Sequence, residues 1–192
     1  MTTADWNVLA RRVSTCTRCP ELARNRTQVV VGQAPPGARL VVLGEAPGAA
    51  EDASGLPFVG KAGRVLDAAL AAAGLPRSTV AVLNTLKCRP PGNRRPAPLE
   101  LAACRPWAEL QLDLIAPRLV VTLGTTATAW ALGRRTVRLG DVRGTVTTTA
   151  SGLAVLPTYH PSGALRWGPN GEPMRLLHAD LALAASLVAE AA

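Results

Sequence analysis

The chain has 192 residues, of which 48% are hydrophobic and only 3% aromatic, so one domain with a largely aliphatic core is expected. Its formal net charge of +8 fits a polyanionic partner and fits equally a high-GC, Arg-rich proteome. The first seven residues are polar, and the apolar segment 176–191 is interrupted by His178, Asp180 and Ser186. We therefore expect neither a signal peptide nor a membrane span, and we expect a cytoplasmic protein.

Helical and strand patterns alternate along the first half of the chain. The expected elements are a helix over residues 5–13, a turn at 16–20, a short strand at 27–31, a buried strand at 40–43, a helix from near Gly63, and a strand at 80–84.

The second half continues the alternation after a loop at 87–98 that is rich in Pro and Arg. A helical stretch at 99–116 contains Pro106, which predicts a break or the first turn of a second helix. The remaining expected elements are strands at 118–123, 145–149 and 154–157 and helices at 125–132 and 174–189. Such alternation predicts an α/β fold, a three-layer αβα sandwich around a mostly parallel sheet, as a single domain over 1–192.

The loop after the strand at 40–43 carries unusual chemistry for a connector. The strand pattern ends at Gly44, and the loop then contains Glu45, Glu51, Asp52 and Phe58, the only Phe of the chain. Open α/β sheets bind their ligands beyond the carboxyl ends of strands. The sequence therefore predicts a pocket at this loop.

The four cysteines form a second pattern, a C-x2-C pair followed far along by a C-x15-C pair. Disulfides are disfavoured in the cytosol, so two such pairs favour a metal site. Zinc and a 4Fe–4S cluster both accept four thiolates, and the spacing does not separate them; buried free thiols are the plainer alternative. The residues are Cys16, Cys19, Cys88 and Cys104.

A third pattern is the string TYHPS at 158–162, which follows a predicted strand. Because Pro161 disfavours helical backbone at the residue before it, His160 is expected at a strand end. On its own a structural role would be the simpler interpretation. Together with the loop after the strand at 40–43 and Asn84 at another strand end, a functional role is favoured. His178 is expected to be a surface or packing residue of the last helix.

The strings GEAPGAAED at 44–52, GLPFVGKAG at 55–63, NTLKCRPPGNR at 84–94 and YHPS at 159–162 together resemble the family 4 uracil-DNA glycosylases. The resemblance runs from about Cys16 to the last helix, in the same order and with similar spacing. It implies the uracil-DNA glycosylase fold and a monofunctional hydrolase that removes uracil from DNA and leaves an abasic site.

The resemblance also implies roles for individual residues. In such an enzyme the base is flipped into a pocket and its N-glycosidic bond breaks through an oxocarbenium-like sugar. His160 would donate to the O2 oxygen of the departing uracil. Asn84 would read the base by accepting from N3–H and donating to O4, and Phe58 would stack on it.

The carboxylates are assigned by the same resemblance. Glu45 would be the catalytic carboxylate, near the water or the cationic sugar. Glu51 would line the pocket, held by Asn93 and helping to exclude the methyl group of thymine, although a solvated loop acid is the alternative; Asp52 is expected to be structural. Further base-binding positions are Gly44, Ala46 and Ser162.

For the cysteines the resemblance implies a 4Fe–4S cluster, with zinc as the alternative. Its simplest role would be structural, tying the N-terminal segment to the loop after the strand at 80–84. The contacts expected with DNA, for which a solvated loop is the alternative in the arginine-rich part, are Arg89, Arg94, Arg95, Pro161, Ala164, Leu165 and Arg166.

Two positions depart from related patterns. Classical uracil-DNA glycosylases carry Asp at the position of Ala46, whereas family 4 members carry a small residue there, as this chain does. Without that Asp, electrostatic stabilisation of the sugar cation and the leaving base must supply more of the rate. The family commonly has a leucine wedge where this chain has Ala164, a methyl too small to fill the hole left by a flipped base. Either Leu165 or Trp167 substitutes, or the enzyme prefers single-stranded DNA, which we favour.

Several alternatives remain at this point. The loop at 87–99 lacks the extra His of the related family that links covalently to DNA, so covalent trapping is not expected. A weakly active or inactive uracil- or single-stranded-DNA-binding module of the same fold is the second function class. A small electron-transfer protein is the third, disfavoured by the absence of clustered ferredoxin-like cysteines. We expect a monomer that acts on uracil-containing DNA.

Overall fold

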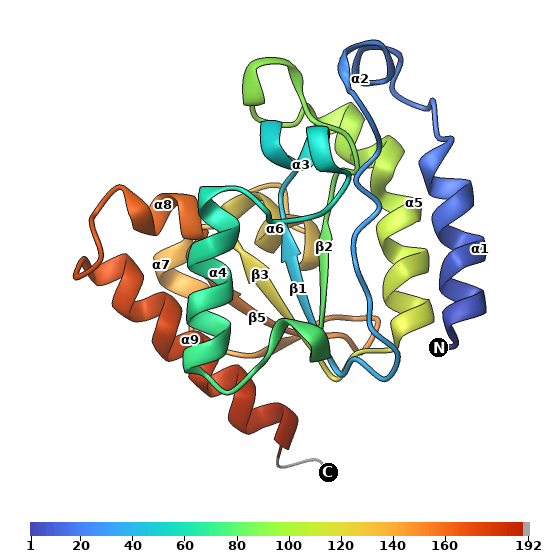
Figure 1. Cartoon of the computed structure of the whole chain (residues 1–192). Coiled ribbons are helices and arrows are strands. Elements are labelled where there is room, and N and C mark those ends of the chain that lie inside the picture. Colours follow the sequence, from blue (N-terminus) through green and yellow to red (C-terminus); the bar gives the residue numbers. More distant parts are fainter. Residues whose placement is uncertain (190–192) are drawn as a thin grey trace.

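The computed structural model describes residues 1–189, and within them a single five-stranded sheet has the order β2-β1-β3-β5-β4 (Figure 1). The first four of these run parallel, and the short β4 pairs antiparallel to β5 at one edge. The strand bounds are β1 Leu40–Gly44, β2 Val80–Asn84, β3 Leu119–Leu123, β4 Thr147–Thr148 and β5 Ala154–Thr158.

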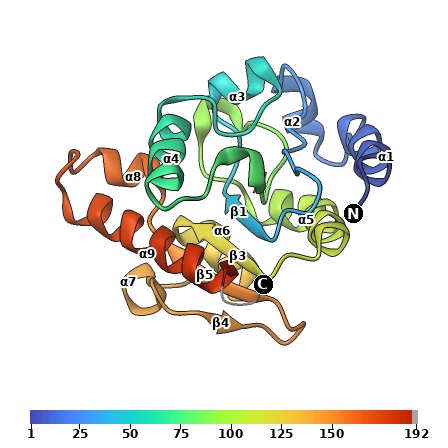
Figure 2. The same cartoon turned by 60° about the horizontal axis from the view of Figure 1, so that its bottom comes forward.

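Helices cover both faces of the sheet, which makes the predicted three-layer αβα sandwich. Helices α4 and α9 pack on one face and α5 and α6 on the other, while α1 lies outside α5 (Figure 2). The helices are α1 Thr3–Ser14, α2 Pro20–Asn25, α3 Ala49–Ser54, α4 Lys61–Ala72, α5 Pro98–Ile115, α6 Gly124–Ala131, α7 Leu139–Val142, α8 Pro161–Leu165 and α9 Glu172–Ala189, with 3-10 turns at Arg77–Thr79 and Pro91–Asn93.

The central strands are apolar on both faces, as their sequence predicts. In β1, Leu40 and Val42 pack with α4 and α9, whereas Val41 and Leu43 pack with α5 and α6. All five residues of β1 are buried, and so are all those of β2 and β3. Alternating burial against two helical layers therefore fixes which way each strand faces.

A third apolar cluster, the N-terminal cluster, joins α1 and α2 to the sheet. It contains buried side chains from α1, α2, α5 and the segments that lead into and out of β2. Its members are Leu9, Val13, Leu22, Val29, Leu86, Cys88, Cys104 and Trp107, with Cys16 and Cys19 packed against them.

The strand expected at 27–31 does not form. The segment is extended and Val30 N–H donates to Lys87 O at 2.8 Å, but the only ladder contact nearby is an isolated bridge between Gln33 and Val82. Gly32, with φ of 113°, turns the backbone out of strand geometry before a ladder can develop. The apolar run was therefore a sign of burial and not of pairing.

Pro106 does not end a helix, contrary to the sequence prediction. Helix α5 continues through it, with Pro106 exposed on its outer side. Cys104, Trp107 and Ala108 are buried on the inner side, so packing along that side sustains the helix although the proline lacks an N–H. Four short helices, α2, α3, α7 and α8, were also not predicted, because their few residues include Gly, Pro or Ser and show no helical period.

No helix within residues 1–189 is both long and apolar enough to cross a membrane. The apolar segment predicted at 176–191 coincides with α9 up to Ala189, and residues 190–192 lie outside the described part of the chain.

Candidate active site

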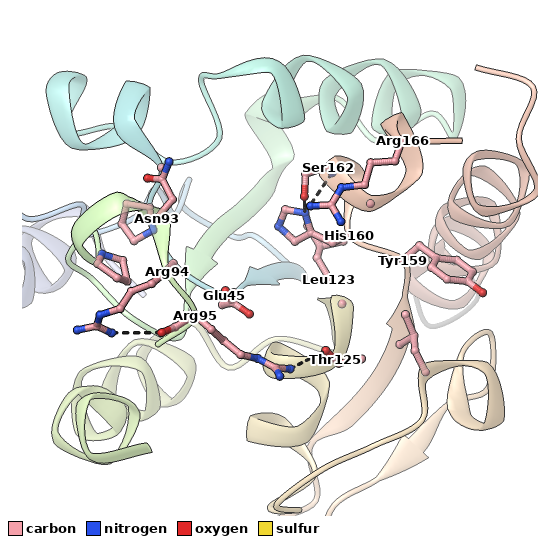
Figure 3. Close-up of a pocket in the computed structure, with 17 residues that line it drawn as sticks. Glu45, Asn93, Arg94, Arg95, Leu123, Thr125, Tyr159, His160, Ser162 and Arg166 are labelled. Carbon is pink, nitrogen blue, oxygen red and sulfur yellow. Dashed lines mark hydrogen bonds between the residues drawn. The ribbon is translucent and has the colours of Figure 1, made fainter. Parts of the chain in front are cut away.

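The carboxyl ends of β1, β2, β3 and β5 meet at one edge of the sheet, and a cavity of about 770 Å³ opens there (Figure 3). The loops after β1 and β2, the start of α6 and the start of α8 form its walls. The lining residues are 45–48, 90, 93–95, 123–125, 139, 159, 160, 162, 163 and 166. The cavity therefore lies where the sequence predicts a pocket.

His160 stands at the first turn of α8 with extended backbone, φ −71° and ψ 134°, as the following proline predicts. Ser162 N–H donates to His160 Nδ1 at 3.1 Å, and Ser162 Oγ lies 2.8 Å from the same nitrogen. Burial lowers the pKa of His160 to about 4, although Glu51 nearby opposes the shift. The ring is thus neutral near pH 7, and because Nδ1 accepts, its proton is on Nε2.

Phe58 and Asn84 meet at Gly44, where the lack of a side chain leaves them room. A Cβ on Gly44 would come within 2.5 Å of Phe58 Cζ and clash with Asn84 Oδ1. The Phe58 ring lies 5.9 Å from the His160 ring, centroid to centroid. Asn84 is buried, and no hydrogen-bond donor among residues 1–189 reaches its Oδ1. A buried acceptor without a partner is costly, so this oxygen is ready to receive a donor from a ligand.

The loop that presents Phe58 is held under strain. Phe58 has φ of 53°, a left-handed conformation that is unfavourable for an aromatic residue. Arg77 fastens the loop, since its Nη2 donates to Pro57 O at 2.6 Å and its Nη1 pairs with Asp67 at 2.6 Å. Gly63 lets α4 approach closely, because a Cβ there would overlap Phe58 O. The position of the ring is therefore determined by several contacts.

Glu51 clamps the same loop from the inside. Its carboxylate accepts from Gly48 N at 3.1 Å, Val59 N at 2.9 Å and Gly60 N at 2.8 Å. It is neither a solvated loop acid nor held by Asn93, whose Oδ1 instead accepts from Arg89 Nε at 2.7 Å. Asp52 is structural, as expected, since its carboxylate accepts from Thr27 N at 3.0 and 3.1 Å.

Glu45 lies half-buried at the centre of the cavity wall, between the His160 side and the Arg95 side (Figure 3). Its backbone oxygen accepts from Thr85 Oγ1 at 2.7 Å and from Leu86 N at 3.0 Å, which ties the loop after β1 to the loop after β2. Ala46 follows it along the wall. The cavity therefore presents one carboxylate at this place and a methyl group beside it.

The arginines expected to contact DNA differ in how freely they can do so. Arg94 makes two hydrogen bonds to Glu100, at 2.6 and 2.9 Å, and pairs with Glu21 at 3.1 Å. Arg95 is exposed, and its guanidinium donates to the hydroxyls of Thr125 and Thr126. Arg94 therefore fastens the loop to α5 and α2, whereas Arg95 and, on the opposite wall, Arg166 remain open to an anion.

Ala164 cannot contact DNA in this structure. It is 0% exposed and packs in the core beneath α8, and Pro161 beside it is also buried. The apolar side chains that reach solvent next to it are Leu165, 41% exposed, and Trp167, 73% exposed. The prediction of Ala164 as a DNA contact is wrong, because the turn of α8 points that residue inward.

The four cysteines gather at the N-terminal cluster and are all free thiols. Burial raises the pKa of Cys104 to about 11, and burial together with the neighbouring Cys88 and Cys16 raises the pKa of Cys19. Within residues 1–189 no three His, Cys, Asp or Glu side chains are arranged as ligands of one metal ion. The sulfurs do receive N–H donors: Trp107 Nε1 to Cys16 at 3.1 Å, Arg26 Nη1 to Cys88 at 3.1 Å and Lys87 N to Cys104 at 3.4 Å.

Lys87 links the cysteines to the pocket. Its side chain is fully buried, and Nζ donates to Asn84 O at 2.7 Å. Burial lowers the pKa of Lys87 to about 8, while Cys104 and Cys88 oppose the shift. Lys87 thus contacts the backbone of Asn84 through its side chain and the sulfur of Cys104 through its own N–H.

Comparison with known proteins places these features in a family. A family model described as the uracil DNA glycosylase superfamily matches residues 31–182. The chain belongs to this superfamily. It is similar to a type-4 uracil-DNA glycosylase of Thermotoga maritima, with 41% identity covering 94% of this chain and 93% of the relative. A type-4 uracil-DNA glycosylase of Pyrobaculum aerophilum is 39% identical over 84% of this chain and 85% of its own.

More distant members of the uracil-DNA glycosylase superfamily are also similar. A type-5 uracil-DNA glycosylase of Mycobacterium tuberculosis is 33% identical, covering 78% of this chain and 70% of its own. The family predicted from the four sequence strings is therefore confirmed.

In this superfamily member, three positioning residues escaped the sequence analysis. Arg77 and Thr125 lie outside the quoted strings, Lys87 lies within the string at 84–94 without an assigned role, and all three act through contacts that only the fold shows. Only the position of Lys87, between Asn84 and Cys88, could have drawn attention to it.

Proposed function

We propose that this protein is a DNA-repair uracil-DNA glycosylase, which hydrolyses the N-glycosidic bond of uracil in DNA and leaves an abasic site. The observation that carries the proposal is the unpartnered, buried Oδ1 of Asn84 beside Phe58, whose ring lies 5.9 Å from the ring of His160. Similarity to type-4 uracil-DNA glycosylases over most of the chain supports it.

The pocket contacts account for selection of the base. Uracil stacked on Phe58 would donate its N3–H to Asn84 Oδ1, and satisfying that buried acceptor favours binding. Cytosine has no hydrogen on N3, so it would leave the acceptor unpaired. A site that buries such a group rejects a ligand that lacks the matching donor far more strongly than a purely apolar pocket would.

His160 and Glu45 act on the bond that breaks. The neutral His160 ring donates from Nε2 to uracil O2, where negative charge develops as the base leaves. The carboxylate of Glu45 stabilises the positive charge on the sugar and positions the water. Ala46 supplies no second carboxylate, so these two electrostatic interactions supply much of the rate.

DNA is held at the walls of the cavity. Arg95 and Arg166 contact phosphates on opposite sides, and Leu165 and Trp167 lie next to the vacated base position. We keep the prediction that single-stranded uracil is the better substrate. Removal from a duplex then depends on the side chains at 165 and 167.

The four cysteines would hold a 4Fe–4S cluster. The protein would act as a monomer. Three N–H donors aimed at sulfur are typical of the surroundings of a thiolate-ligated cluster. When bound, the cluster would link the segment between α1 and α2 to the loop after β2 and to α5 through its four thiolate ligands. An ultraviolet–visible spectrum with iron and sulfide analysis of the purified protein tests this, and a colourless zinc protein would contradict it.

The activity is tested with a labelled single-stranded oligonucleotide that carries one uracil, treated with alkali after incubation. Wild type is compared with His160→Ala, Asn84→Ala and, as a matched control away from the cavity, Asn170→Ala. Cleavage by wild type and the control, lost in the first two variants, is expected. Tight binding of the uracil strand without any cleavage by folded wild type would support the alternative, an inactive binding module.

A further inference from the structure

A second groove begins where the active-site cavity ends. It has a volume of about 700 Å³ and lies between the start of α5, α6 and the segment after α6. Arg95 and Thr125 line both hollows, so the two adjoin at these residues. Because Arg95 donates to the hydroxyls of Thr125 and Thr126, its guanidinium is held at the boundary between them.

The walls of this groove are basic. Four arginines line it, Arg95, Arg105, Arg134 and Arg135, and no Asp or Glu does. Arg105 is paired with Glu109 and stacked 4.4 Å over the Trp130 ring, so it belongs to the protein's own packing. Arg134 and Arg135 are exposed, and no ion pair between residues 1 and 189 includes them or Arg95.

The floor of the groove is apolar, formed by Leu101, Ala129 and Val137 among others. A basic rim over an apolar floor suits a single strand of nucleic acid, whose phosphates pair with arginines while sugars and bases cover apolar surface. A small anion would need only one or two of these arginines. The number of arginines in the groove and its position beside the cavity therefore favour a polymeric ligand.

We infer that this groove binds the single-stranded flank of the substrate on one side of the flipped uracil, with Arg134 and Arg135 contacting its phosphates. The inference rests on the proposed function for the identity of the strand. It adds that contact with DNA extends past the cavity on the Arg95 side, where Arg134 and Arg135 line the groove but not the cavity.

Binding is measured first, without catalysis. Fluorescence anisotropy of a labelled, uracil-free single strand is recorded at several salt concentrations for wild type, Arg134→Ala and Arg135→Ala. Loss of one phosphate contact lowers the slope of log affinity against log salt by about 0.7 for single strands. The control is Arg118→Ala, which removes an exposed arginine at the start of β3, at the opposite edge of the sheet, and is expected to leave the slope unchanged.

Excision kinetics then test the direction. Three single-stranded substrates are compared: one with flanks of about ten nucleotides, and two with either the 5′ or the 3′ flank cut to about two. Shortening one flank should raise KM several-fold with little change in kcat, whereas shortening the other should have less effect. In the Arg134→Ala/Arg135→Ala double variant the sensitive flank should no longer matter.

The two ideas fail differently. If neither flank matters more than the other, or if Arg134→Ala and Arg135→Ala behave as Arg118→Ala does in the anisotropy assay, the groove does not bind DNA, even when excision is normal. If no excision occurs but the salt slopes change as expected, the groove stands as a DNA-binding surface and the proposed enzymatic function fails.

Discussion

The substitution Gly44→Ala tests whether the pocket depends on the close approach of Phe58 and Asn84. Gly44 pairs with Asn84 in the parallel register of β1 and β2, and its oxygen accepts from Thr85 N at 2.9 Å, so the backbone there cannot yield easily. A methyl at this position would lie 2.5 Å from Phe58 Cζ and clash with Asn84 Oδ1. The two side chains that would hold the base must therefore move.

The magnitude follows from the overlap. Ordinary contacts begin near 3.4 Å, so the ring or the amide must retreat by about 1 Å. Misplacement of a positioning group by about 1 Å can cost about 100-fold in rate, equivalent to about 2.7 kcal/mol of barrier. The substitution leaves the backbone of β1 and its pairing with β2 in place, so the protein should still fold.

The assay is single-turnover excision from a single-stranded uracil oligonucleotide, with thermal unfolding measured in parallel. Gly140→Ala is the matched control, since a Cβ there meets nothing within 4 Å and Gly140 does not line the cavity. We expect the control to retain full activity. A folded Gly44→Ala variant that excises uracil at the wild-type rate would refute the placement of the base between Phe58 and Asn84.

Three further predictions concern other parts of the site. The pKa of His160 is about 4 in the folded protein and 6.5 ordinarily, so its contribution to stability is full above pH 6.5 and is lost as pH falls through 4. Between pH 7 and pH 4 the free energy of unfolding, measured with urea, should therefore fall by about 3 kcal/mol less in His160→Gln than in wild type. An equal fall in both proteins would contradict the burial of a neutral ring. Arg94→Ala should lower the melting temperature with little effect on DNA affinity and Arg95→Ala the reverse, as thermal unfolding and anisotropy would show; a reversed pattern would contradict their assigned contacts. Leu165→Ala combined with Trp167→Ala should slow excision from duplex DNA several-fold more than from single strands, and equal slowing would exclude a wedge role.

The layers of the fold could be predicted because strong local signals agree with the tertiary structure. Val41 and Val42 face opposite helical layers, and a strand apolar at both positions can only be central. The same reasoning failed at 27–31, where Val29 is buried in the N-terminal cluster and Val30 is also buried, yet neither enters the sheet. An apolar run predicts that a segment is buried, but it does not predict whether another strand lies beside it to form a ladder.

The candidate site was predictable where it depends on strand ends and less so where it depends on side-chain direction. His160 and Asn84 lie at the predicted edge because parallel strands end together. Ala164 was misplaced because α8 is too short to show a period, so its inward direction could not be read. Arg94 appeared equivalent to Arg95, since its partners Glu100 and Glu21 are distant enough in sequence to hide the pairing.

The ammonium group of Lys87 gives the base-recognition site and the cysteine site a common support. A stretch of five residues holds Asn84 at one end and Cys88 at the other, and between them the lysine is anchored to the carbonyl of Asn84. Lys87 therefore contacts both the sulfur of Cys104 and the backbone of Asn84, whose side chain we propose as the group that distinguishes uracil from cytosine.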